Sequence, residues 1–167
     1  LLTGKTVGII GFGNIGRDLA GLLRGFGYRL LIHDVQKLEH IAENFRAIQT
    51  SKQELLEQAD IVTVHVPYDS STHHLIGKNE LLAMKNDAVL INTSRGDVVD
   101  EFALYEVMKR GKFIGAASDV FAKEPCQDSP LFQLPNFFST PHIGGASREA
   151  IMAMGTAAID NLVKLMK

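Results

Sequence analysis

Three glycines at a fixed spacing are the first residues of this sequence whose pattern points to ligand binding. The loop runs from Gly11 to Gly16 as G-x-G-x-x-G, with Gly13 between them, and it joins an apolar run to a helical pattern. Because glycine has no side chain, backbone N–H groups and the positive end of a helix can approach a pyrophosphate closely. We expect Asn14 and Ile15 to supply those N–H groups, so the loop predicts a dinucleotide site.

One carboxylate extends this prediction to the sugar of the nucleotide. Asp34 lies 18 residues after Gly16, at the end of the second apolar run. A carboxylate at this position accepts hydrogen bonds from both hydroxyls of an adenosine ribose and repels a 2′-phosphate. The sequence therefore favours NAD over NADP, although the nearby Lys37 weakens that preference. One alternative is that Asp34 is a solvated carboxylate at a strand end. Another is that the domain binds no cofactor.

Residues suited to a binding site also follow the later apolar runs. Ligands of open parallel sheets bind beyond the carboxyl ends of the strands. We therefore expect these residues to share one crevice with the glycine loop. They are Val66 and Pro67 after the fourth run, Thr93, Ser94 and Arg95 after the fifth, Asp119 after the sixth, and His142, Gly144 and Gly145 after the last.

Short apolar runs alternate with longer amphipathic stretches, and this alternation predicts the elements that position these residues. Strands that are apolar on both faces, with helices between them, form a parallel sheet that is covered on both sides. The predicted fold class is therefore α/β, a Rossmann-type doubly wound parallel sheet with helices on both faces. Strands are expected over 6–10, 28–32, 46–49, 61–66, 88–92, 113–118 and 137–139, and helices over 15–26, 38–45, 51–58, 79–84, 100–110 and from 147 onward.

The composition limits the kinds of partner. The length of 167 residues fits one domain. Seventeen Lys and Arg against nineteen Asp and Glu give a net charge of -2, so no broad basic surface is expected for nucleic acid. The apolar runs are far shorter than the ~20 residues that span a bilayer, so we expect no membrane partner. The single cysteine, Cys126, suits a reducing compartment and favours a cytoplasmic location.

Five ordered blocks of sequence carry a resemblance to a known family. They are Val7 to Gly16, His65-Val66-Pro67 with Thr72 downstream, Ile91 to Gly96 running into Val99-Asp100-Glu101, Asp119-Val120-Phe121 with Glu124-Pro125, and Pro141 to Gly145. Together they resemble the NAD-binding domain of the D-isomer-specific 2-hydroxyacid dehydrogenases, over essentially the whole chain. The segment 141–150 is most similar to the phosphoglycerate dehydrogenase branch, with the hydroxypyruvate and glyoxylate reductases close to it.

The resemblance implies a hydride transfer between NAD(H) and a small D-2-hydroxy acid or 2-oxo acid. Arg95 matches the catalytic arginine, whose guanidinium can hold the carboxylate and the carbonyl of the substrate together. His142 matches the acid/base residue, and Glu124 matches the carboxylate that orients it. Some relatives that act on formate carry Gln at the position of Glu124, so this residue favours a 2-hydroxyacid substrate.

The resemblance also implies contacts along the whole cofactor, from the nicotinamide to the adenine. Asp119 matches the residue that recognises the nicotinamide carboxamide. The backbone of Thr93 and Ser94 and the segment His142 to Gly145, which includes Gly144, also match positions at the nicotinamide. Val66 and Pro67 match positions near the adenine, and Thr72 matches a further contact.

The family subunit has a second domain, built largely from chain outside the matched region. The resemblance therefore implies that residues 1–167 are a single NAD-binding domain, excised from a longer two-domain subunit whose substrate domain is absent, and inactive or weakly active alone. It also implies a homodimer, because the family's dimer contacts run largely through this domain. The alternative function is an NAD(H)-sensing, corepressor-like binding module of the same fold, since such relatives can keep Arg95, Glu124 and His142.

The remaining histidines and the cysteine predict no further chemistry. His73 and His74 are adjacent and lack the i, i+4 spacing that puts two imidazoles on one helix face, so we expect no zinc site and no other metal. His65 lies at the end of an apolar run and is expected to be a hydrogen-bonded structural residue. Cys126 follows Glu124-Pro125 without an obvious base, so we expect no role for its thiol.

Overall fold

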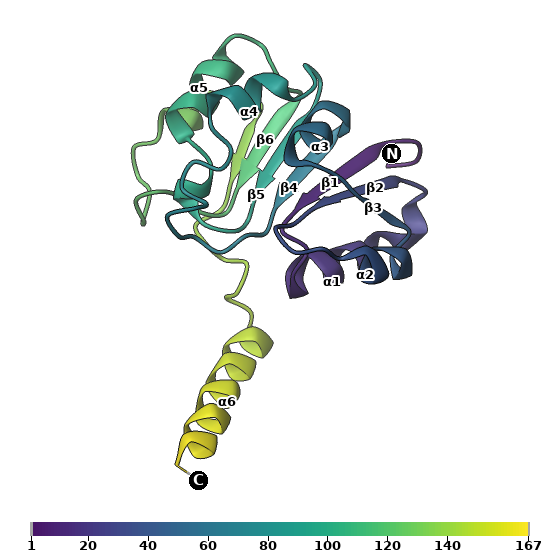
Figure 1. The fold of residues 1–167 in the computed structure, drawn as a ribbon. Helices are drawn as coiled ribbons and strands as arrows, with labels where there is room; N and C mark the ends of the chain where they lie inside the picture. Colours follow the sequence, from purple (N-terminus) through teal and green to yellow (C-terminus); the bar gives the residue numbers. More distant parts are fainter. Residues whose placement is uncertain (1, 167) are drawn as a thin grey trace.

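Seven parallel strands form one sheet in the computed structural model, which describes residues 2–166 (Figure 1). The strand order is β3-β2-β1-β4-β5-β6-β7, and each neighbouring pair is parallel. This is the sheet of a Rossmann-type α/β fold, so the predicted fold class is confirmed. The strands are β1 (Thr6–Ile10), β2 (Arg29–His33), β3 (Ala47–Gln49), β4 (Ile61–Val64), β5 (Val89–Asn92), β6 (Gly115–Ser118) and β7 (Phe137–Ser139).

Helices make the crossovers that parallel strands require. A short 3₁₀ helix at Leu23–Phe26 continues α1, so the helix predicted over 15–26 changes its type before it ends. Two other 3₁₀ helices cover Gly96–Val98 and Pro130–Gln133. The α-helices are α1 (Asn14–Leu22), α2 (Glu39–Asn44), α3 (Lys52–Gln58), α4 (Lys78–Ala83), α5 (Glu101–Lys109) and α6 (Arg148–Leu165).

Two apolar cores hold the helices on opposite faces of the sheet. Ile9 of β1 packs in one cluster with Ala20 of α1, while its neighbour Ile10 packs in the other cluster with Leu55 of α3. Successive side chains of a strand point to opposite faces, so both faces of β1 are covered. A Cβ on Gly8 would lie 2.5 Å from Leu55 Cδ2, which shows that α3 packs directly on the strand.

Two of the predicted strand boundaries are wrong by two residues, and the others agree to within one residue. β4 ends at Val64 rather than at residue 66, and β6 begins at Gly115 rather than at residue 113. Phe113 has a φ of 79°, outside the strand region, and its N–H donates to the Asn86 carbonyl at 2.7 Å. Its side chain is buried, so its apolar character reflects core packing and not membership of the strand.

The sheet changes direction at its centre, between β1 and β4. From β1 the chain builds outward through β2 and β3 to one edge, and from β4 it builds outward to β7 at the other edge. The loop 11–16 follows β1 and therefore lies at this topological switch point, where ligands of such sheets bind. Because all strands are parallel, the segments after β5, β6 and β7 lie at the same end of the sheet as this loop.

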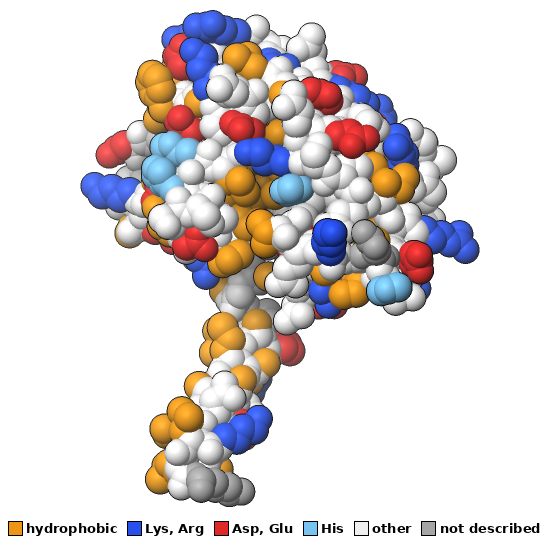
Figure 2. All heavy atoms as spheres, in the orientation of Figure 1, with side chains coloured by type: hydrophobic (Ala, Val, Ile, Leu, Met, Phe, Trp, Pro, Cys, Tyr) orange, Lys and Arg blue, Asp and Glu red, His pale blue; other side chains and the backbone are white. Residues whose placement is uncertain are grey.

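α6 extends away from the sheet (Figure 1). Ser147 caps its N-terminus, because its Oγ accepts a hydrogen bond from the Ala150 N–H at 3.1 Å. Apolar side chains run along its surface (Figure 2), among them Ile151, Met154 and Leu162, all of which are exposed. No helix within residues 2–166 combines the length and the apolar character needed to cross a bilayer.

Candidate functional site

The three glycines of the loop after β1 are needed for different physical reasons. Gly11 has a φ of 89°, and a Cβ there would lie 2.6 Å from the His65 carbonyl oxygen. A Cβ on Gly16 would lie 2.5 Å from the Gly11 carbonyl oxygen, so both glycines are required by the packing of the protein itself. A Cβ on Gly13 would meet nothing within 4 Å. Gly13 therefore leaves open space in front of α1, as a phosphate-binding loop needs.

Asp34 is tied to this glycine loop. Its Oδ2 accepts a hydrogen bond from the Phe12 N–H at 2.8 Å, and its Oδ1 accepts one from the Gln36 N–H at 2.9 Å. The carboxylate thus fixes the end of β2 against the loop after β1. Each carboxylate oxygen can accept more than one hydrogen bond, so a ribose hydroxyl can still be accepted. Lys37 is exposed three residues further on.

Asn92 shapes the segment that carries Arg95. It is buried at the end of β5, and its Oδ1 accepts hydrogen bonds from the N–H and the hydroxyl of Ser94, at 3.1 and 2.7 Å. Its Nδ2 donates to the Arg95 carbonyl at 2.9 Å. One buried amide side chain therefore fixes the backbone on both sides of Ser94. Arg95 is exposed, as is Thr93, at this end of the sheet.

The residue after Arg95 touches the segment that carries Glu124. A Cβ on Gly96 would lie 1.9 Å from the Phe121 carbonyl carbon and 2.1 Å from the Ala122 nitrogen. Only glycine permits this approach of two backbones. Phe121 in turn donates its N–H to Glu124 Oε1 at 3.0 Å. The structure therefore joins the Arg95 segment to the turn at 121–124.

Glu124 and His142 form a hydrogen-bonded pair. Glu124 Oε2 lies 2.7 Å from His142 Nδ1, and since a carboxylate only accepts, Nδ1 carries the proton. Hydrogen bonds from His142 and from the Phe121 N–H, with the nearby charge of Arg95, lower the pKa of Glu124 below its ordinary value. Nε2 of His142 is left to act on a ligand. A cleft of about 530 Å³ opens beside the pair, with Phe121 and Phe132 in its wall.

Asp119 holds the segment that carries His142. Its Oδ1 accepts hydrogen bonds from the Thr140 hydroxyl and from the Ile143 N–H at 2.8 Å, and its Oδ2 accepts one from the Gly144 N–H at 2.8 Å. Burial of Asp119 opposes ionisation, but these three hydrogen bonds outweigh burial and lower its pKa. His142 itself has a φ of 56°, a left-handed conformation. The carboxylate binds the two N–H groups that follow and so stabilises this turn.

The other candidate residues lie at the same end of the sheet but make fewer contacts. Val66 is half-buried and Pro67 is exposed, directly beyond β4. The Thr72 hydroxyl donates to the Pro67 carbonyl and accepts from the Asp69 N–H, both at 2.8 Å, so it stabilises its own turn. Gly145 is exposed, and a Cβ there would meet nothing within 4 Å.

The adjacent histidines lie beside a third possible metal ligand that their spacing did not predict. His73, His74 and Asp97 offer atoms within 4.8 Å of one another. The two imidazole rings, however, are stacked with centroids 4.0 Å apart and planes only 20° apart. The lone pairs of a ring nitrogen lie in the ring plane, so stacked rings do not direct them at one ion. The absence of a metal therefore stays a prediction.

Neither His65 nor Cys126 has surroundings that favour chemistry at neutral pH, although Nδ1 of His65 is buried and has no hydrogen-bond partner among residues 2–166. His65 Nε2 lies 3.0 Å from the Thr63 hydroxyl, and burial lowers the pKa of the imidazole. Burial, and next the charge of Glu101, raises the pKa of the Cys126 thiol. A thiol with a raised pKa is a poor nucleophile at neutral pH.

Comparison with known proteins agrees with this geometry. Residues 1–144 match the family model described as "D-isomer specific 2-hydroxyacid dehydrogenase, NAD binding domain". The chain belongs to this family. The resemblance inferred from the five sequence blocks is therefore confirmed. The expectation that the domain binds NAD is confirmed as well.

Several relatives of this NAD-binding domain are longer proteins. The chain is 42% identical over 166 residues to a glyoxylate reductase from Thermococcus litoralis, with 99% of the chain and 50% of that protein covered. It is 38% identical to a D-3-phosphoglycerate dehydrogenase from Methanocaldococcus jannaschii, with 99% of the chain and 32% of that protein covered. A D-lactate dehydrogenase from Aquifex aeolicus, solved with NAD and lactic acid, gives a TM-score of 0.84 at 34% identity, with 96% of the chain and 54% of that protein covered. The chain thus spans about half or less of these relatives.

Within the NAD-binding domain, several residues hold the site together although the sequence pattern assigned them no role. They are Asn92, Gly96, Glu101 and Thr140, and each bonds or packs against a segment that bears a candidate residue. Asn92 is the last residue of β5 and Thr140 directly follows β7, and a polar residue at the end of a strand is a signal that could have found both. The contacts of Gly96 and Glu101 with residues 121 and 122 leave no such signal, because they join distant parts of the chain.

Proposed function

We propose that this chain is the cofactor-binding domain of an oxidoreductase that transfers a hydride between NAD(H) and a small D-2-hydroxy acid or 2-oxo acid. The observation that carries the proposal is the pairing of Glu124 with His142, 2.7 Å apart, at the same end of the sheet as the loop 11–16. The relatives are named for a glyoxylate, a 3-phosphoglycerate and a lactate reaction, which share this chemistry.

The residues present fit an NAD molecule. Gly13 leaves open space in front of the N-terminus of α1, and the N–H groups of Asn14 and Ile15 begin that helix. The first N–H groups of a helix have no partner within the helix, so they are free for a pyrophosphate. Asp34 would hold the ribose hydroxyls, and Val66 would lie near the adenine. When bound, NAD supplies the hydride acceptor, and NADH supplies the donor.

Arg95 would bind the substrate. Its guanidinium is planar and can donate to the carboxylate and the carbonyl oxygen of a 2-oxo acid at the same time. This double contact fixes the orientation of the substrate and polarises the carbonyl for hydride attack. The exposure of Arg95 leaves the guanidinium accessible to such a ligand. The buried Asn92 holds the backbone from which Arg95 extends.

His142 would move the proton. In the reducing direction Nε2 donates a proton to the carbonyl oxygen, and in the oxidising direction it accepts the proton of the hydroxyl. Glu124 keeps the proton on Nδ1, orients the ring and stabilises the imidazolium. Asp119 fixes the turn at 142–144 and, with one accepting position left, would also bind the nicotinamide carboxamide.

We further propose that this domain works together with a second domain that binds the other side of the substrate. The span of about half the length of two relatives, and the exposed apolar side chains of α6, support this proposal. Isolated residues 1–167 are then expected to bind NAD but to turn over slowly, because the site cannot close and exclude water. A homodimer and a cytoplasmic location stay predictions.

Calorimetry and kinetics test this function separately. The chain should bind NADH, and Asp34→Ala should weaken that binding. In the complete subunit, NADH oxidation should be found for at least one of a panel of 2-oxo acids, with His142→Ala lowering kcat by about 10² or more. Arg95→Ala should raise KM as well. Binding of NADH without any oxidation would instead favour the corepressor-like sensing module, and no binding would overturn both functions.

A further inference from the structure

Glu101, the first residue of α5, directs its carboxylate at the turn that carries Glu124. Its Oε1 accepts a hydrogen bond from the Ala122 N–H at 2.6 Å. The preceding N–H of the same turn, that of Phe121, donates to Glu124 Oε1 at 3.0 Å. Two neighbouring N–H groups therefore bind two carboxylates, one from outside the turn and one from within it. The outer carboxylate holds the turn in place while the inner one contacts His142.

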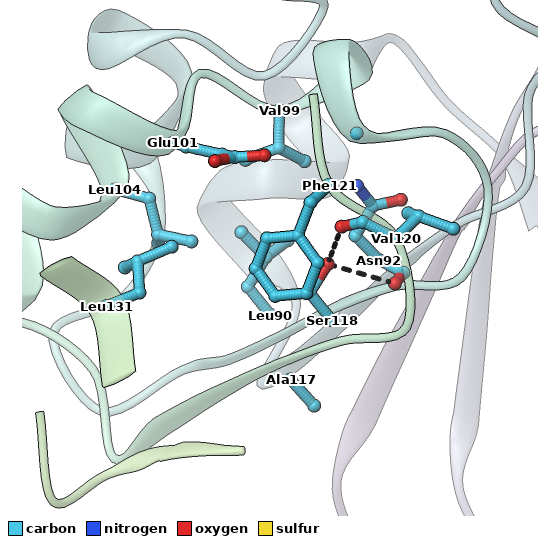
Figure 3. Close-up of a pocket in the computed structure, with 11 residues that line it drawn as sticks. Leu90, Asn92, Val99, Glu101, Leu104, Ala117, Ser118, Val120, Phe121 and Leu131 are labelled. Carbon is cyan, nitrogen blue, oxygen red and sulfur yellow. Dashed lines mark hydrogen bonds between the residues drawn. The ribbon is translucent and has the colours of Figure 1, made fainter. Parts of the chain in front are cut away.

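The surroundings of Glu101 are unfavourable for a negative charge. The residue is half-buried and lies with Val99, Leu104 and Phe121 around a small cavity of about 10 Å³ (Figure 3). Burial, with three nearby carboxylates, raises the pKa of Glu101, and the hydrogen bond from Ala122 opposes that shift. An apolar side chain would fill this wall at a lower desolvation cost. An apolar side chain could not, however, accept the hydrogen bond from the Ala122 N–H.

α5 gives Glu101 a rigid support. Asp100 caps the helix, since its Oδ1 accepts the Ala103 N–H at 2.9 Å. Ala103, Leu104 and Val107 are buried against the core. A side chain on a packed, capped helix transmits its position to its partner better than one on a loop. The turn at 121–124 is thus held from two sides, by Gly96 through backbone contact and by Glu101 through a hydrogen bond.

We propose that Glu101 is a positioning residue for the acid/base pair: by binding the Ala122 N–H, it fixes the turn from which Glu124 orients His142. This inference rests on the proposed function of Glu124 and His142. Glu101 has no contact with the reacting atoms in this scheme, and acts only through the turn.

The test is the titration of the Glu124 carboxyl carbon, followed by NMR in the 167-residue chain. Glu101→Ala removes the acceptor, so Glu124 should leave His142 and its lowered pKa should rise. Glu101→Gln keeps an acceptor but removes a like charge, so the pKa of Glu124 should fall or stay unchanged. The pKa of Glu124 should therefore rise in Glu101→Ala and not in Glu101→Gln if the turn is held by the hydrogen bond. The charged or titratable groups facing Glu101 and Glu124 are Asp97, Asp100, Arg95, His142 and the Cys126 thiol.

Amide exchange supplies the second readout and the control. Loss of a hydrogen bond to a charged acceptor should speed exchange of the Ala122 N–H by about ten-fold or more in Glu101→Ala, with recovery in Glu101→Gln. Glu106→Ala, at a half-buried position of the same helix that pairs with Arg110, should change neither readout. If Glu101→Ala does not fold, Glu101→Asp replaces it, because the shorter side chain keeps the charge and withdraws the acceptor; Glu124 should then titrate at a raised pKa.

The failures of the two proposals differ in this experiment. If Glu124 titrates alike in the wild type, Glu101→Ala and Glu101→Asp, the positioning role is wrong while the acid/base pair stands. If Glu124 shows no lowered pKa in the wild type and does not respond to His142→Ala, the pair itself is absent and the proposed function loses its basis.

Discussion

Gly96 and Phe121 lie in backbone contact, although they are 25 positions apart in the sequence. Gly96 follows Arg95, the proposed substrate-binding residue, and Phe121 donates its N–H to Glu124, the proposed partner of the acid/base residue. The spacing between the two functional segments is therefore set by the absence of one side chain.

Gly96→Ala should separate the two segments. The added Cβ would lie 1.9 Å from the Phe121 carbonyl carbon, so one backbone must move. We expect a loss of about 3 kcal/mol in the free energy of unfolding, measured by denaturant titration. Gly25→Ala is the matched control, because a Cβ there would meet nothing within 4 Å. Equal stability of the two variants would show that the close approach is not a constraint.

Gly13→Val should weaken cofactor binding without unfolding the domain. Its side chain would enter the open space in front of α1, where NAD is proposed to bind. We expect NADH affinity to fall by at least about ten-fold, with a stability loss below about 1 kcal/mol from the poorer N-cap residue. Gly16→Ala should chiefly lower the stability of the domain, because its Cβ would lie 2.5 Å from the Gly11 carbonyl oxygen and strain the loop itself. Calorimetric titration and thermal unfolding distinguish the two effects.

The turn that carries His142 should loosen in acid. Asp119 has a lowered pKa in the folded chain, so its ionised form stabilises the fold above the unfolded value of about 3.9. That stabilisation is lost as the pH falls from about 4 through the lowered, folded-state pKa. Exchange of the Ile143 and Gly144 amides should therefore accelerate in this range. Protection that stays constant down to the acid unfolding transition would contradict this role of Asp119.

Asp119→Asn should loosen the same turn at neutral pH. One oxygen of the side chain remains an acceptor, but the amide nitrogen cannot accept the second N–H of the pair from Ile143 and Gly144. The expected loss of stability at neutral pH is about 1–3 kcal/mol, and this difference from the wild type should shrink as the pH falls from about 4 through the lowered pKa of the wild-type carboxylate. Denaturant titrations of both proteins at several pH values measure this difference.

Arg95→Lys should fail to replace the guanidinium in the complete subunit. An ammonium is a point charge and cannot make two parallel hydrogen bonds to a carboxylate. We expect a rise in KM for the 2-oxo acid and a fall in kcat, while NADH binding by the domain changes by less than about three-fold. Kinetics that match the wild type would show that Arg95 does not bind the substrate through a paired contact.

Local signals along the chain predicted the strands, the helices and the residues at the strand ends. Hydrophobic periodicity and the glycine spacing are local signals, and a parallel sheet brings the carboxyl ends of its strands to one edge. Arg95, Asp119 and His142 could therefore be assigned to one end of the sheet without coordinates. Periodicity was misleading at Phe113, where an apolar residue with a φ of 79° belongs to the core and not to the strand.

The contacts that hold the candidate residues in place form only in the folded chain. Asp119 binds the turn at 142–144, Glu101 binds the Ala122 N–H, and Gly96 admits the backbone of Phe121. Each of these contacts joins residues that lie at least 21 positions apart in the sequence, and the pair Glu101 and Ala122 is the least separated. Such contacts depend on distances between chain segments after folding, and residue type and spacing along the sequence do not encode those distances in any readable pattern.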